Sequence, residues 1–310
     1  MWPKKLDWKQ LKFGVEIEFV GGRPAEVELL PGWEMSLNEL QLDETGAASG
    51  SELKPPPILW AERDQIRIML ERLHAQGATA NWSCGLHVHV GLDPWGQDIV
   101  APLLDAALLY QDTLQELLGM SEHRLFFCPP VTKAIRERYA AMPSAEAVHN
   151  AGRPQSHRCG INVAPWYDIG TVEIRYANGS VRLDEVLNTI ELCLRFVAAV
   201  GAAETLPLEK EAFADALHAP ARGYPAPLPA PRWYEERMRL EELLIPVIEP
   251  AILRVVPQGE IHHVLPTEDG LVVGVEDEHG KLAEYVVTPP AEGWTVTRRV
   301  TPNPETISEQ

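Results

Sequence analysis

The chain is short of cysteine, of basic residues and of long apolar runs. Its four cysteines, Cys84, Cys128, Cys159 and Cys193, are far apart and form no C-x-x-C pair. We therefore expect neither a disulfide framework nor a zinc knuckle, and we favour a reducing cytoplasm. No apolar run approaches the roughly 20 residues that span a bilayer. The first residues also lack the pattern of a signal peptide, so we expect no membrane association.

The shortage of basic residues gives the chain a strongly acidic balance. It has 27 lysines and arginines against 45 aspartates and glutamates, a net charge of −18. This charge argues against broad binding to nucleic acid or to an anionic membrane, although a local basic site for a phosphate group remains possible. No P-loop and no G-x-G-x-x-G follows a strand-like segment. Metals and arginines, rather than a glycine-rich loop, would then have to hold any nucleotide.

One pattern of ionisable residues recurs on three strand-like segments. Each segment places two such side chains two residues apart: Glu16-Ile17-Glu18, His87-Val88-His89 and Glu173-Ile174-Arg175. Residues i and i+2 of a strand point to the same face, and the residues between them point to the other. If the three strands share a sheet, one face is core. The other face then carries metal-binding groups and a guanidinium, the layout of a divalent-metal site for an anionic substrate.

Hydrophobic periodicity predicts an α+β fold. The predicted strands cover residues 11–20, 79–92 and 170–176, and the predicted helices 61–76, 98–118, 132–142 and 184–200. The strands are amphipathic, whereas buried parallel strands would be apolar throughout. We therefore expect an antiparallel sheet with helices on its apolar face and an open, concave polar face.

The composition changes after residue 217. Residues 218–250 are predicted to be a proline-rich linker with a helix near 233–244, and residues 251–303 a small β-barrel-like module. We expect this module to have strands at 252–256, 271–275, 283–287 and 295–300. It could bind a protein partner. Residues 1–217 would form the catalytic domain.

The residue types suggest separate roles within the predicted site. Glu16 and Glu18 can hold Mg²⁺ or Mn²⁺, because these cations prefer oxygen ligands. His87 and His89 on one strand face can bind a metal, or one of them a phosphate. Taken singly, Glu16 and Glu18 could simply lie on a solvated strand face. His87 and His89 could be one surface residue and one core residue.

Three further segments are candidates for the same site. Glu173 could bind a cation while Arg175 holds a phosphate or carboxylate in its planar fork, although the two could also be a plain surface ion pair. Glu52 precedes a run of prolines. Arg158 and Asn162 stand shortly before the third strand, where they could contact substrate.

Five segments in this order resemble the amidoligase family, carboxylate–amine ligases related to glutamine synthetase and glutamate–cysteine ligase. The resemblance covers roughly residues 11–200. It is carried by residues 13–19, 50–56, 84–91, 158–162 and 171–180. It implies an antiparallel-sheet ligase fold that forms an amide or peptide bond, with ATP as co-substrate and Mg²⁺ or Mn²⁺ as cofactor. A small-molecule or peptide carboxylate and an amine would be the substrates.

The resemblance also implies roles for individual residues. Glu16, Glu18, Glu52, His89 and Glu173 are expected to be metal ligands. The expected catalytic residues are His87, Glu173 and Arg175, and Arg175 is expected to contact the transferred phosphate. Substrate or nucleotide is expected to be bound by Arg158, Asn162 and Arg175. In the family a Ser-Pro pair follows the glutamate that matches Glu52, whereas this chain has Lys54-Pro55.

Two other functions fit parts of the pattern. A metal-dependent hydrolase or cupin-like oxygenase could use His87, His89 and a carboxylate such as Asp93. A non-enzymatic adaptor could keep an inert ligase fold and bind a partner through its C-terminal module. The excess of carboxylates and the Glu173–Arg175 strand favour the ligase.

Overall fold

The computed structural model describes residues 1–43, 46–149, 159–268, 270–277, 281–288 and 295–300. The chain divides into two compact units. The first unit comprises Met1–Asn150 and Arg158–Ala230, and the second includes Pro231–Gln310. Of the predicted site residues, Arg158 lies outside the described residues.

Three strands open the first unit, and α-helices separate the later strands from them and from one another. Its strands are β1 (Phe13–Val20), β2 (Glu34–Leu42), β3 (Ala48–Lys54), β4 (Gly85–Gly91), β5 (Ile161–Asn162) and β6 (Thr171–Asn178). Its helices are α1 (Asp64–Ala75), α2 (Val100–Leu118), α3 (Lys133–Ala141), α4 (Trp166–Ile169), α5 (Leu183–Gly201) and α6 (Lys210–Leu217).

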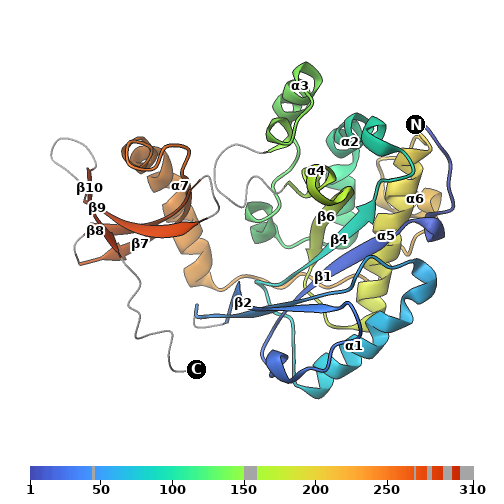
Figure 1. Cartoon of the computed structure of the whole chain (residues 1–310), viewed down its shortest axis with the longest axis horizontal. Helices are drawn as coiled ribbons and strands as arrows, with labels where there is room; N and C mark the ends of the chain where they lie inside the picture. The colour runs from blue at the N-terminus through green and yellow to red at the C-terminus, as the bar shows by residue number, and fades with distance from the viewer. Residues whose placement is uncertain (44–45, 150–158, 269, 278–280, 289–294, 301–310) are drawn as a thin grey trace. The chain divides into compact units, whose positions relative to one another are not determined.

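The six strands form one sheet in the order β2-β3-β1-β4-β6-β5 (Figure 1). Every paired neighbour in it is antiparallel. The strands that carry the three ionisable pairs, β1, β4 and β6, are therefore adjacent. This confirms the predicted α+β class and the expectation that the three pairs share one sheet.

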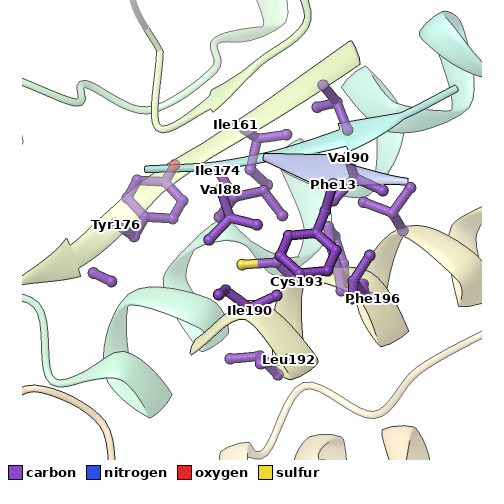
Figure 2. Close-up of a cluster of buried hydrophobic side chains, with 14 of the residues drawn as sticks. Phe13, Val88, Val90, Ile161, Ile174, Tyr176, Ile190, Leu192, Cys193 and Phe196 are labelled. Carbon is purple, nitrogen blue, oxygen red and sulfur yellow. The ribbon is translucent and has the colours of Figure 1, made fainter. Parts of the chain in front are cut away.

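The apolar face of the sheet packs against helices. On β1, buried residues such as Val15 and Ile17 alternate with half-buried ones. Figure 2 shows the buried apolar side chains between the sheet and α5. Val88 and Ile174 of the sheet face Ile190 and neighbouring side chains of the helix. All four cysteines are free and buried. Burial of this face is the main favourable contribution to the fold, and it fixes which side chains remain on the opposite face.

The opposite face is less open than the alternation predicts. His87, Glu173 and Arg175 are each less than a tenth exposed, and so are Glu52 and Asn162. Seven of the eight residues of β6 are buried, so this strand is covered on both faces. The polar side chains therefore lie in a recessed site where charges interact more strongly than at a solvated surface.

The second unit combines one long helix with a four-stranded sheet. Helix α7 spans Arg232–Ile252, and the sheet has the order β10-β9-β8-β7. Its strands are β7 (Glu260–Thr267), β8 (Gly270–Glu276), β9 (Leu282–Thr288) and β10 (Thr295–Val300). Ile248 and Ile252 of the helix pack with Val264 and Val273 of the sheet in one apolar cluster.

Two predictions about the second unit were wrong in detail. The strand predicted at 252–256 is not a strand: residue 252 ends α7, and β7 begins only at residue 260. The helix predicted to end near residue 244 continues through Pro246 and Pro250. A proline inside a helix costs about 3 kcal/mol, and the buried side chains of Ile248 and Ile252 offset that cost by packing.

Within the described residues, no helix combines the length and the apolar character needed to cross a membrane.

Candidate functional site

The antiparallel register places the predicted site residues opposite one another. Glu16 of β1 pairs with His87 of β4, and His89 of β4 pairs with Glu173 of β6. Asn162 of β5 is opposite Glu173 on the other side. Side chains directly opposite on one face of an antiparallel pair are close enough to interact. A row of polar side chains thus crosses four neighbouring strands.

Glu16 lies between the two histidines. Its Oε2 is 3.0 Å from Nδ1 of His87, and its Oε1 is 3.4 Å from Nε2 of His89. One carboxylate thus contacts both imidazoles, each through a different oxygen. Burial alone would raise the pKa of Glu16, but the hydrogen bonds to His87 and His89 hold it well below its usual range. Glu16 is therefore ionised at neutral pH.

Glu173 and Arg175 form a buried ion pair on β6. Arg175 Nη1 donates to Glu173 Oε1, and Asn162 Nδ2 donates to Glu173 Oε2 at 2.9 Å. Burial would raise the pKa of Glu173, yet Arg175 and the two histidines lower it. The Nε of Arg175 is buried and has no hydrogen-bond partner in the described part of the chain. Such an unpaired buried donor is costly and marks a site that a ligand can complete.

His89 is held in a defined orientation. Its Nδ1 is 3.0 Å from Oγ1 of Thr171, and its Nε2 is 3.4 Å from Glu16 and 3.7 Å from Glu173. A hydrogen bond from one ring nitrogen commonly orients the other nitrogen toward a metal. Burial would lower the pKa of the metal-free imidazole, but Glu16 and Glu173 raise it. This orientation makes His89 the better metal-ligand candidate of the two histidines.

Glu52 and Lys54 extend the site onto β3. Lys54 Nζ donates to Glu52 Oε1 and lies 3.9 Å from Glu16 Oε1. Burial and repulsion from Glu16 raise the pKa of Glu52 to about 7, against the attraction of Lys54. Burial would lower the pKa of Lys54, but the hydrogen bond to Glu52 raises it. Lys54 is therefore part of the site.

Glu18 faces a different part of the site from Glu16. Its Oε2 accepts a 2.6 Å hydrogen bond from the backbone N of Gly85, and its Oε1 is 3.9 Å from His87 Nδ1. Gly85 leaves room for its neighbours here: a Cβ would lie 2.4 Å from Arg124 Nη2 and 2.8 Å from His87 Nε2, so these side chains would have to shift. Glu18 therefore anchors the start of β4 beside His87.

Arg124 is a site-lining residue that the sequence pattern did not indicate. It lies in the short helix η5 (Glu122–Phe126) and is 2% exposed. Its guanidinium donates to the backbone oxygens of Cys84 at 2.8 Å and Arg175 at 3.1 Å. It thereby ties the beginning of β4 to β6 next to His87. No spacing rule links η5 to the strands, so only the fold shows this role.

Two groups of side chains could each hold a cation. One is formed by Glu16, His89 and Glu173, and the other by Glu16, Glu52 and His87. Within each group the ligand atoms lie within 4.8 Å of one another. Carboxylate oxygens with one imidazole suit Mg²⁺ or Mn²⁺. Asp93, the carboxylate considered for a hydrolase, is in neither group among the described residues.

The comparison with protein families agrees with this site. The family model described as "putative amidoligase enzyme" matches residues 25–197, more than half of the chain. The chain belongs to this family. The match confirms the resemblance seen in the motifs and indicates a ligase that forms amide bonds. It includes the strands that carry Glu52, His87 and Glu173, whereas β1 with Glu16 precedes it. No curated protein matches the chain.

Proposed function

We propose that this amidoligase uses ATP to join a carboxylate to an amine through an acyl-phosphate intermediate. The observation that carries the proposal is the placement of Arg175 beside the cation-binding groups. Its guanidinium is buried next to Glu173 and retains an unpaired Nε donor. A buried, preorganised guanidinium is well suited to stabilise charge on a phosphoryl group in transfer.

The proposed chemistry has two steps. A carboxylate oxygen of the substrate attacks the γ-phosphorus of ATP, the bond from that phosphorus to the β–γ bridging oxygen breaks, and ADP leaves. The amine then attacks the acyl carbon, loses a proton, and expels phosphate. The phosphate carries one of the original carboxylate oxygens. Phosphoryl transfer requires mainly positioning and charge neutralisation from the protein.

The side chains of the site divide these tasks. A divalent cation would be held by Glu16, His89 and Glu173. Glu52 and His87 belong to the neighbouring group, which shares Glu16. A bound Mg²⁺ supplies charge neutralisation on the phosphate oxygens. Arg175 would contact the transferred phosphoryl group. Asn162 orients Glu173 through its 2.9 Å hydrogen bond, so its effect on substrate is indirect.

The experiment that tests this proposal measures ADP and phosphate release from ATP and Mg²⁺. Pools of carboxylates and pools of amines are supplied separately and together. We expect release that rises only when both pools are present, because the acyl phosphate needs an amine to turn over. Bound Zn²⁺ or Fe²⁺ with no ATP turnover in any pool would contradict the ligase and favour the hydrolase or oxygenase.

A further inference from the structure

The side chain of Lys54 lies at the second of the two cation-binding groups. Its ammonium hydrogen-bonds to Glu52 and lies 3.9 Å from Glu16 Oε1. Glu16 and Glu52 are two of the three members of the group that includes His87. The ammonium thus pairs directly with Glu52 and lies at longer range from Glu16, near the oxygen that also faces His89.

The backbone of β3 fixes the position of Lys54. Glu52 and Lys54 are two residues apart on the strand, so their side chains share a face. Lys54 pairs with Glu34 of β2, and Glu52 pairs with Glu18 of β1. The lysine side chain is about one-third exposed, while that of Glu52 is 9% exposed. The ammonium can therefore remain partly hydrated while it covers the buried carboxylates.

Among the described residues, no lysine or arginine bridges the two carboxylates of the other cation-binding group. Arg175 contacts Glu173, but its other close polar contact is His87 Nδ1 at 3.3 Å rather than a second carboxylate. Imidazoles rather than a cationic side chain lie between Glu16 and Glu173. His89 Nε2 faces both carboxylates, and His87 Nδ1 is 3.0 Å from Glu16 and 3.8 Å from Glu173. A divalent cation could insert among the three ligand atoms of this group while Lys54 keeps its hydrogen bond to Glu52.

We propose that Lys54 acts as a tethered cation that occupies the Glu16–Glu52–His87 group, so that the protein binds one divalent cation, at Glu16, His89 and Glu173. A divalent cation at Glu52 would lie at short range from the ammonium that already pairs with that carboxylate, and the two positive charges would repel each other. Lys54 thereby sets the metal stoichiometry. This inference rests on the proposed function, because it concerns the cation that ATP-dependent transfer would use.

Mn²⁺ binding to the full-length protein tests this inference. Isothermal titration and electron paramagnetic resonance would count the ions bound to the wild type, Lys54→Met, Lys54→Arg and Lys12→Met. Lys12 is an exposed lysine just before β1 and serves as the matched control. We expect one ion in the wild type, Lys54→Arg and Lys12→Met. We expect two in Lys54→Met, with the second bound at least about tenfold more tightly than any second ion in the wild type.

Two results would overturn the inference. One is a wild type that binds two Mn²⁺ ions, or none; the other is a folded Lys54→Met variant that binds the same single ion. If Lys54→Met does not fold, the number of Mn²⁺ ions bound to the wild type still tests the inference. The count needs neither ATP nor turnover. If one Mn²⁺ ion binds to the wild type and two bind to Lys54→Met, but the protein shows no ATP turnover, the proposed role of Lys54 is supported and the proposed ligase function is not.

Discussion

Glu16 on β1 and His87 on β4 are directly opposite in the antiparallel ladder, with Glu16 Oε2 3.0 Å from His87 Nδ1. The second oxygen of Glu16 faces His89 at 3.4 Å. Glu16 is also the one residue that both cation-binding groups of the described chain share. Its carboxylate is therefore the centre of the site, and its removal should affect every function assigned to the site.

The Glu16→Gln variant should lose divalent-cation binding. The amide keeps the shape of the side chain but removes the negative charge from both groups. We expect Mn²⁺ affinity to fall by about 100-fold or more, since even residues that only support a metal ligand contribute about 10- to 100-fold. Isothermal titration measures this change. Glu26→Gln, at an exposed residue paired with Arg23, is the control and should bind as the wild type does. Unchanged affinity in Glu16→Gln would remove Glu16 from the site.

The Gly85→Ala variant should disturb His87 and Arg124. The added Cβ would lie 2.4 Å from Arg124 Nη2 and 2.8 Å from His87 Nε2. We expect the free energy of unfolding to fall by about 1–3 kcal/mol, as overpacked sites do. Urea unfolding gives this value. Gly14→Ala is a matched control on the same sheet, because its Cβ would meet nothing closer than His89 Cβ at 4.0 Å. Equal stability of the two variants would contradict the packing described at Gly85.

The Glu52 carboxyl should make the metal-free protein less stable as pH rises. Its pKa in the folded protein is about 7, above the 4.5 of an ordinary glutamate. The folded state therefore binds a proton more tightly than the unfolded state. The resulting stability is fully present below pH 4.5 and is lost as pH rises through about 7. The loss amounts to about 3 kcal/mol.

Comparison with Glu52→Gln isolates this effect. Urea unfolding in EDTA, at intervals between pH 4.5 and 8, would give the stability difference between wild type and variant. The free energy of unfolding of the wild type, relative to that of the variant, should fall as pH rises. Glu26→Gln, at an exposed glutamate paired with Arg23, controls for the loss of one carboxylate. A wild type that gains stability relative to Glu52→Gln over this range would show that the sign is wrong.

The Arg175→Lys variant should separate metal binding from catalysis. Lysine keeps the positive charge but not the planar set of donors. We expect turnover to fall about 100-fold, the usual cost of losing one preorganised donor to a transition-state charge. Mn²⁺ stoichiometry should stay unchanged. Arg182→Lys, at an exposed arginine paired with Asp184, is the control. Wild-type turnover in Arg175→Lys would argue against contact with the phosphoryl group.

The sequence predicts the faces of the strands well because side-chain alternation depends on local geometry alone. The rule that grouped Glu16 with Glu18 and His87 with His89 also applies to Glu52 with Lys54 and to Thr171 with Glu173. Lys54 and Thr171 could thus have been found in the same way. Lysine and threonine are not typical metal ligands, so a pattern of metal-binding residue types does not indicate their roles.

The remaining features depend on contacts between distant segments. Arg124 comes from a short helix and reaches β4 and β6 through backbone oxygens, which no spacing pattern encodes. The strand register that places Glu16 opposite His87 is equally non-local. In the second unit, α7 continues past the predicted end near residue 244 and through Pro246 and Pro250, because packing of Ile248 and Ile252 against the sheet outweighs the local preference.

The fate of the carboxylate oxygens tests the proposed ligase most directly. Once an active carboxylate and amine are found, the reaction would be run with the carboxylate doubly labelled with ¹⁸O, and the released phosphate analysed by mass spectrometry. The acyl-phosphate route predicts one ¹⁸O atom in the phosphate for each amide formed, together with ADP. Unlabelled phosphate, or AMP and pyrophosphate as products, would contradict it.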